Sequence, residues 1–166
     1  MTEHIVDIYG EIHTPEERTR IENLIRSNHK KIPYDYLLSE EMGPNVIFSN
    51  VGKEQAIKSG NYNGSSRSLE LAIELDIPII GIDLWDKEVY ENDTDTNKVT
   101  SFKLREENMV KVIKAYKVKG NCAVIVGDTH LRKSKTKMLG NPSKIYTTFK
   151  NSKGVNIYRS LDKEID

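Results

Sequence analysis

Two separate segments of the chain carry the same pattern of residues that can perform acid–base or metal chemistry. Residues 5–13 and 122–130 each contain a short apolar run that ends in glycine, an acidic residue, one variable residue and a histidine. Histidine and carboxylate side chains act as general acids and bases, and they also bind divalent metal ions. The two pairs are Glu11 with His13 and Asp128 with His130. This duplication predicts one reactive site to which both segments contribute.

The elements around these pairs are expected to bring them to one edge of a sheet. Short apolar runs bounded by glycine are typical of buried strands in a parallel sheet, and ligands bind outside the carboxyl ends of such strands. Two further predicted strands, over residues 34–39 and 77–83, also end in acidic residues. The side chains expected beside the two histidines are Glu11, Glu40 or Glu41, Asp83, Trp85 and Asp128.

Helix signals separate these strands. Thr14, followed by proline, begins a helix that ends near residue 31, because threonine is a favoured N-cap and proline suits the first helical position. Ser66 or Ser68 begins a second helix, and a long amphipathic helix spans residues 100–119. Strands that alternate with helices in this way indicate an α/β domain.

The rest of the chain is less regular. Residues 45–65 are ambiguous, and residues 91–97 are expected to form a polar loop. Residues 144–149 and 155–160 are expected to pair as a β-hairpin, whose exposed edge can pair with a second copy of the chain. The sequence therefore predicts a single α/β domain over residues 1–166, with a mainly parallel central sheet flanked by helices and a C-terminal β-hairpin.

The collected side chains are compatible with two kinds of hydrolytic chemistry. In the first, His13, His130 and Glu40 bind a divalent ion such as Mn, Co, Fe or Zn, which generates hydroxide from water near neutral pH. In the second, no metal takes part, and a histidine activates water beside a glutamate that orients it. The spacing of these residues along the chain does not decide between the two.

A basic cluster directly follows the second histidine, where Arg132 and Lys133 precede two further lysines. A charge run of this kind usually forms a solvated surface, but this position also suits contact with a phosphate or carboxylate group. The expected substrate contacts are Arg132, Lys133, Asp83 and Trp85.

The composition narrows the class of protein. The 166 residues include 25 Lys and Arg against 25 Asp and Glu, and this zero net charge argues against bulk binding to nucleic acid or anionic membranes. A local basic patch remains compatible with that balance. No apolar run reaches the roughly 20 residues of a membrane span. The one cysteine, Cys122, lies in an apolar strand and excludes an internal disulfide. We expect a cytoplasmic protein without membrane attachment.

With these motifs, the chain resembles the superfamily that includes TraB and Tiki proteins, ChaN-like proteins and erythromycin esterases. Its hallmarks are paired Gly-x-x-His motifs, commonly a Glu before the first His, a Glu at the end of the next strand, and an Arg with a downstream Met on a later helix. The matching positions are Gly10 to His13 with Glu11, Glu40, Arg105 with Met109, and Gly127 to His130. They occur in the expected order between residues 5 and 131. The basic run stands where family members often have a glycine.

The resemblance implies an α/β fold whose motifs converge on one pocket, with Arg105 holding an anionic group or pairing with Glu11 or Glu40. It also implies hydrolysis, through a proposed metal in Tiki-like proteins and on esters in erythromycin esterases, whereas ChaN-like members bind haem. We expect a small hydrolase acting on an ester, amide or phosphoester. The alternatives are a non-catalytic protein that binds a small anionic or metallated ligand, and a family member that has lost its activity.

Overall fold

The computed structural model describes residues 4–60, 62, 65–84 and 98–160 of the chain. Within these residues, six strands form one sheet in the order β3-β4-β2-β5-β1-β6. The strands are β1 (Val6–Glu11), β2 (Tyr36–Ser39), β3 (Asn45–Ile47), β4 (Ile79–Gly81), β5 (Cys122–Gly127) and β6 (Val155–Tyr158). All neighbouring strands are parallel except β3, which is antiparallel to β4. The mainly parallel α/β sheet predicted from the sequence is therefore confirmed.

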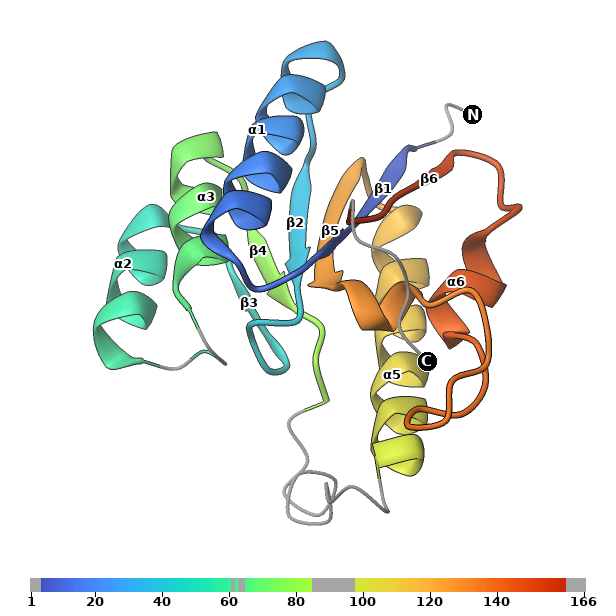
Figure 1. The fold of residues 1–166 in the computed structure, drawn as a ribbon. Helices are drawn as coiled ribbons and strands as arrows, with labels where there is room; N and C mark the ends of the chain where they lie inside the picture. Colours follow the sequence, from blue (N-terminus) through green and yellow to red (C-terminus); the bar gives the residue numbers. More distant parts are fainter. Residues whose placement is uncertain (1–3, 61, 63–64, 85–97, 161–166) are drawn as a thin grey trace.

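Helices cover both faces of this sheet. They are α1 (Pro15–Lys31), α2 (Asn50–Ser59), α3 (Arg67–Leu75), α5 (Lys98–Lys117) and α6 (Lys144–Phe149), and a short 3-10 helix, η1 (Asp128–Leu131), directly follows β5. Figure 1 shows α1, α2 and α3 on one side of the sheet and α5 and α6 on the other. The predicted start of α1 is confirmed, because the Thr14 hydroxyl accepts a hydrogen bond from the backbone N–H of Glu17.

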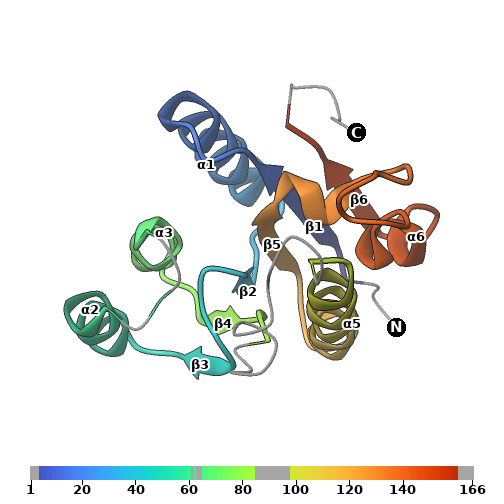
Figure 2. The same cartoon turned by 60° about the horizontal axis from the view of Figure 1, so that its bottom comes forward.

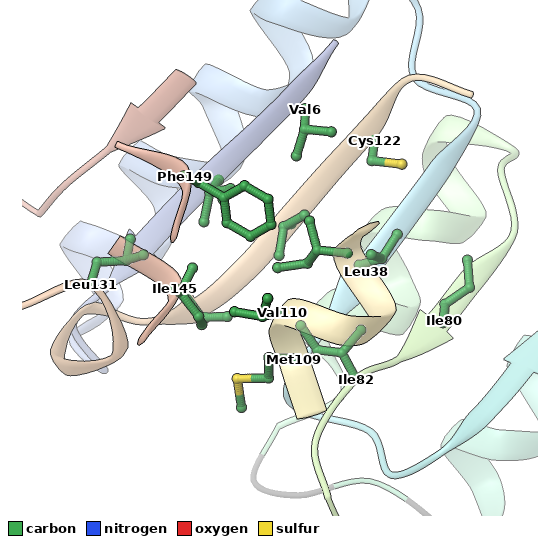
Figure 3. Packing of buried hydrophobic residues seen from close by; sticks show 14 residues of the cluster. Val6, Leu38, Ile80, Ile82, Met109, Val110, Cys122, Leu131, Ile145 and Phe149 are labelled. Carbon is green, nitrogen blue, oxygen red and sulfur yellow. The ribbon is translucent and has the colours of Figure 1, made fainter. Parts of the chain in front are cut away.

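The central strands β1 and β5 are buried on both faces, and most of their residues are apolar. All six residues of β1 and all six of β5 are buried. On one face, side chains such as Leu38 and Cys122 pack against Met109 of α5 and Phe149 of α6, as Figure 3 shows. On the other face, the strands pack against α1 and α3. β5 therefore lies in the middle of the sheet, between β1 and β2, with both of its faces covered.

The predicted C-terminal hairpin is wrong. Residues 144–149 form helix α6, and β6 pairs with β1 in the parallel direction, which a hairpin cannot do. The Ser143 side chain caps α6 by accepting hydrogen bonds from the backbone N–H groups of Ile145 and Tyr146. Ile145 and Phe149 are both buried, and a spacing of four residues puts two side chains on one face of either a helix or a strand. The periodicity was therefore ambiguous, and the cap decides for the helix.

The ambiguous segment over residues 45–65 contains β3 and α2, while the predicted loop over residues 91–97 lies outside the described residues. None of the helices in the described part of the chain is both long enough and apolar enough to cross a membrane.

This topology places the carboxyl ends of β1, β2, β4 and β5 at one edge of the sheet, and Figure 2 turns that edge toward the reader. β5 is inserted between β1 and β2, so that Glu11 is aligned with Gly127 across one strand pair and Ser39 with Ile125 across the other. The residues that follow these positions therefore meet at the same edge, which is where open α/β sheets bind ligands.

Candidate functional site

A pocket of about 350 Å³ opens at this edge, between the ends of β1, β2 and β5 and the first half of α5. The residues that line it are His13, Arg18, Glu40, Glu41, Phe102, Arg105, Gly127, Thr129 and His130. Both histidines, Glu40 and Arg105 were predicted to belong to one site, and the structure brings all four together.

Glu40 is held in its ionised form. Its carboxylate accepts hydrogen bonds from the backbone N–H of Gly127 and from Arg105, the latter at 3.3 Å. It also contacts His130 Nε2 at 3.1 Å. Burial by itself would raise the pKa of Glu40, but His130, the Gly127 N–H and Arg105 outweigh it and lower the pKa to about 2. A carboxylate with this many donors is a fixed negative charge and a poor proton acceptor.

Gly127 makes the approach of Glu40 feasible. A Cβ atom at position 127 would lie 2.8 Å from Glu40 Oε1, closer than real Cβ contacts come. The backbone of Gly127 has φ −59° and ψ 141°, an ordinary extended conformation. The close carboxylate, and not the backbone angles, therefore favours glycine here.

His130 is a buried imidazolium that bridges two carboxylates. Its Nδ1 lies 2.9 Å from Glu106 Oε2 and its Nε2 lies 3.1 Å from Glu40 Oε2, so both ring nitrogens face acceptors. Burial lowers the pKa of His130, but Glu40 and Glu106 outweigh it and raise the pKa to about 9. The Phe102 ring stacks on the imidazole at a centroid distance of 4.7 Å, which fixes the plane of the ring.

Arg132 binds Glu106, one of the two carboxylates that contact His130, and it is not one of the residues that line the pocket. Its guanidinium donates to Glu106 at 2.6 and 3.3 Å, and also to the backbone oxygens of Thr129 and Asn141. Only 5% of Arg132 is exposed. Its predicted substrate contact has no support in this arrangement, because each of these donors is directed at an acceptor within the protein.

Arg105 is anchored by Asp83. Its Nε and NH2 atoms donate to the two oxygens of Asp83 at 2.9 and 3.1 Å, a bidentate geometry that fixes the guanidinium plane. Asp83 is fully buried, so its role here is to position Arg105, and it is not one of the residues that line the pocket. Of the two predicted partners for Arg105, Glu40 makes the ion pair, at 3.3 Å.

His13 lies at the rim of the pocket with 63% of its side chain exposed. Arg18 NH2 donates to His13 Nδ1 at 2.6 Å, and Arg18 NH1 donates to the Ser65 hydroxyl at 2.5 Å. Because a guanidinium has no acceptor, Nδ1 of His13 carries no proton and the neutral ring carries its proton on Nε2. Burial and the charge of Arg18 both lower the pKa of His13. His13 is therefore a neutral hydrogen-bond donor toward the pocket.

Glu41 and Glu11 are two buried carboxyl groups in a different state from Glu40. Glu41 accepts a hydrogen bond from the Ser65 hydroxyl at 3.3 Å, and burial together with the nearby Glu11 raises its pKa to about 7. Burial also raises the pKa of Glu11 to about 7, despite the nearby Arg18. Of these two, Glu41 lines the pocket. The structure therefore places both Glu40 and Glu41 at the site, with opposite shifts in pKa.

Asp128 is directed away from the pocket. Its carboxylate accepts two hydrogen bonds from Arg159 at 2.8 Å each and one from the backbone N–H of Ser160 at 2.9 Å. These donors follow β6 and hold the C-terminal end of that strand against η1. The contacts of Asp128 give no support to its predicted catalytic role.

The last two predicted substrate contacts lie elsewhere. Lys133 is exposed, and its Nζ lies 5.8 Å from the centre of the Tyr146 ring, outside the set of pocket residues. Trp85 lies outside the described residues.

The predicted metal site has a donor set that does not suit a cation. A metal ligand must offer a lone pair, whereas both nitrogens of His130 face carboxylates and Nδ1 of His13 accepts from Arg18. Glu40 already neutralises Arg105 and His130. Within the described residues, no group of three His, Cys, Asp or Glu side chains is arranged to hold a metal ion. The metal site stays a prediction.

Three charged or aromatic site residues were missed by the sequence analysis. Arg18 lies one turn into α1, Phe102 lies on α5 one turn before Glu106, and Glu106 directly follows Arg105. A signal existed for Arg18, because the predicted helix begins directly after His13 and its first turn must lie beside that histidine. Glu106 gave no signal, because a charged residue on a charged helix is usually solvated.

The sequence matches no protein-family model, and no curated protein sequence matches it. A solved structure described as "Bacterial protein toxins" is similar to this chain with a TM-score of 0.48 and 14% sequence identity. The similar region covers 86% of this chain and 32% of that one, so this chain spans about a third of the length of that protein. So distant a similarity carries no functional argument, and the function has to be argued from the site.

Proposed function

We propose that the pocket hydrolyses an ester, amide or phosphoester bond in a small substrate that carries an anionic group. One observation carries the proposal, namely the opposite environments of the adjacent residues Glu40 and Glu41 in one pocket. Glu40 receives charged and backbone donors, whereas the described hydrogen-bond donor to Glu41 is a neutral hydroxyl. Carboxylates held in different protonation environments mark the acid–base groups of many enzymes.

Glu41 is the proposed general base. It retains proton-accepting capacity because it is buried beside Glu11 and receives no guanidinium hydrogen bond from a described residue. In the proposed reaction Glu41 takes a proton from water as the water oxygen attacks the carbonyl carbon or phosphorus. The same carboxyl group then gives the proton to the leaving group as the bond to it breaks. A group whose pKa is near the working pH is well suited to both transfers.

His13 and Arg18 are proposed to bind the substrate oxygen and its anionic group. The Nε2–H of neutral His13 can donate to an oxygen that gains negative charge, and this proton is held on Nε2 by the Arg18 hydrogen bond at Nδ1. The described hydrogen-bond partners of Arg18, which are His13 and Ser65, are both uncharged. The charge of Arg18 also acts on the nearby Glu11 and Glu41, and we propose that its guanidinium binds a carboxylate or phosphate group of the substrate.

Glu40, Arg105 and His130 are proposed to form the rigid wall of the site. Each of them is fixed by at least two partners from different elements, which include Asp83, Glu106 and the backbone of Gly127. Such prearranged charges stabilise a developing charge without reorganising during the reaction. This part of the site coincides with the motif positions of the TraB, Tiki, ChaN-like and erythromycin esterase superfamily, and membership of that superfamily is part of the proposal.

The test is a turnover screen with ester, amide and phosphoester substrates that carry a carboxylate or phosphate. We expect Glu41→Gln to reduce turnover at least about 100-fold, in line with the usual contribution of a general base. The matched control is Glu70→Gln on the exposed surface of α3, which should leave turnover unchanged. Full activity of a folded Glu41→Gln variant would refute the proposed base. Elemental analysis of the active protein, and turnover after chelation, test the metal prediction in the same preparation.

A second candidate function, non-catalytic binding of a small anion, is favoured by Arg18 and its uncharged partners. In that case wild-type protein turns over none of the substrates, Arg18→Ala abolishes binding of the anionic compounds, and Glu41→Gln leaves binding intact. The predicted cytoplasmic location and self-association are also part of the proposal. Cell fractionation and light scattering test them.

A further inference from the structure

The zero net charge of the chain conceals a strong separation of charge. Residues 98–160, which form α5, β5, η1, α6 and β6, contain fifteen lysines and arginines and only three acidic residues. Residues 1–97 contain nine basic and nineteen acidic residues. Figure 1 shows that α5 and α6 cover one face of the sheet, opposite α1, α2 and α3. The α5 and α6 layer therefore carries an excess of positive charge that the whole-chain sum hides.

The exposed side of α5 is the best-defined part of this layer. Lys103, Leu104, Lys111, Lys114 and Val118 are all exposed, and their spacing puts them on one stripe of a helix. We call these five residues the α5 stripe. The helix has 20 residues, so the stripe extends along an element of roughly 30 Å. Glu107 is an exposed acidic residue on the same side of the helix.

Further lysines extend the positive charge beside α5. The segment from Thr129 to Ser160 contains no acidic residue. Its exposed lysines include Lys135, Lys137 and Lys144. The turn that contains Lys137 packs against the start of α5, because a Cβ on Gly140 would lie 3.1 Å from Val99.

Large apolar side chains stand exposed among these lysines. Val118 is 77% exposed and Leu104 is 40% exposed, both in the α5 stripe, and Met138 in the neighbouring turn is 57% exposed. Lysines alone would suit any polyanion. Apolar side chains gain free energy only where the partner removes them from water.

We infer that the α5 stripe binds the surface of an anionic membrane, with its lysines at the lipid headgroups and Leu104 and Val118 inserted into the interfacial region. Lysine stems can lie along an apolar surface while the ammonium groups reach the phosphate and carboxylate oxygens of the lipids. The absence of a membrane-spanning helix in the described part of the chain is compatible with such peripheral binding.

The exposed positive charges of the α5 stripe are lysines and not arginines, which argues against nucleic acid as the partner. Arg105 on α5 and Arg132 directly after η1 are both buried, and they are bonded to Asp83 and Glu106. The exposed cations of the α5 stripe are all lysines, and the stripe contains no aromatic side chain. Proteins that bind nucleic acid use arginine forks and stacked aromatic side chains for specific contact, whereas compact lysine charges suit diffuse attraction to a lipid surface.

The expected size of the effect follows from the number of lysines. Each lysine near an anionic surface strengthens binding roughly fivefold, so three of them account for about 100-fold. Glu107, which is exposed on the same side of α5, opposes this attraction. Substitutions at neighbouring positions should therefore change binding in opposite directions, which a merely structural role would not produce.

The experiment is cosedimentation of the full chain with phosphatidylcholine vesicles, with and without phosphatidylserine. Wild-type protein should bind only the mixed vesicles, and less so as salt is raised. The combined variant Lys103→Gln, Lys111→Gln and Lys114→Gln should bind about 100-fold more weakly, and Glu107→Gln about fivefold more tightly. Val118→Ser should also weaken binding.

The matched control changes three exposed lysines of the opposite layer, Lys30→Gln, Lys31→Gln and Lys58→Gln, and so removes the same charge. It should change vesicle binding less than about threefold. Equal losses in both triple variants, no binding of wild-type protein to the mixed vesicles, or binding to a DNA duplex but not to vesicles would each overturn the inference. Circular dichroism confirms that both triple variants fold.

Discussion

The substitution Glu106→Gln tests the buried charge arrangement that holds His130. Glu106 is 1% exposed and accepts hydrogen bonds from His130 at 2.9 Å and from Arg132 at 2.6 and 3.3 Å. Glu106 also accepts a hydrogen bond from the backbone N–H of Lys144, at 3.2 Å. Glutamine keeps the volume of the side chain but removes its negative charge. Among the described ion pairs, His130 then keeps the one with Glu40, and Arg132 loses the one with Glu106.

The expected cost is large for a single substitution. Removing one partner of a buried ion pair typically destabilises a protein by about 3–5 kcal/mol. For a chain of this length, that corresponds to a fall in Tm of roughly 6–20 °C. The matched control is Glu107→Gln, because Glu107 lies next in the chain and is exposed. Its substitution should change the free energy of unfolding by less than about 0.5 kcal/mol.

The pH dependence gives the sharper part of this prediction. Burial lowers the pKa of His130 in the folded protein, but Glu40 and Glu106 outweigh burial and raise the pKa from 6.5 to about 9. A raised pKa contributes stability that is fully present below about pH 6.5 and is lost as the pH rises through about 9. That contribution is of the order of 3 kcal/mol, shared between the two carboxylates. The difference in stability between wild type and Glu106→Gln should therefore shrink by about 1–2 kcal/mol over this range.

Urea denaturation followed by circular dichroism, at a pH near 6 and another near 10, measures this difference, and NMR of the imidazole nitrogens reports the protonation of His130 directly. We expect both nitrogens of His130 to be protonated at neutral pH. A constant difference in stability at both pH values, or a neutral His130 at pH 7, would refute the reasoning that Glu106 and Glu40 hold an imidazolium.

Three further predictions concern single groups. Gly127→Ala should displace Glu40, because the new Cβ would lie 2.8 Å from the Glu40 oxygen. Loss of the hydrogen bond between the Gly127 N–H and Glu40 should lower the free energy of unfolding, measured by urea denaturation, by about 1.5–3 kcal/mol. Unchanged stability and turnover would contradict this prediction. Turnover by the wild type should rise as the pH passes through about 7, where Glu41 loses its proton, and the same limb in Glu41→Gln would exclude this carboxyl group. Cys122 is buried with its pKa raised to about 12, so a thiol reagent should label it only after denaturation; rapid labelling of the folded protein would contradict this.

Several elements of the fold were predictable from the sequence because their signals are local. Thr14 followed by proline sets the start of α1, and the glycine at position 127 marks the end of a fully apolar strand. The strands β1 and β5 were predicted within two residues at their ends. Helix α6 was not, because its buried residues Ile145 and Phe149 have a spacing that both helices and strands satisfy.

The sequence by itself determined which residues stand at the carboxyl edge of the sheet. Apolar runs of the right length must be buried, and the polar residues that follow them in the chain must then emerge at the same edge. This is why Glu40, Glu41, His13 and His130 could be assigned to one site before their positions were known, and why Arg105 could be added from a motif.

Only the tertiary structure decided which of these charges are neutralised and which are available. Asp128 and Glu40 have similar positions after their strands, but Arg159 binds the first and Gly127, Arg105 and His130 bind the second. These pairings join residues 31 to 90 positions apart, so they depend on strand order and helix packing. The physical reason is that a charge in a buried site takes its protonation state from its nearest partners, and the tertiary fold supplies those partners.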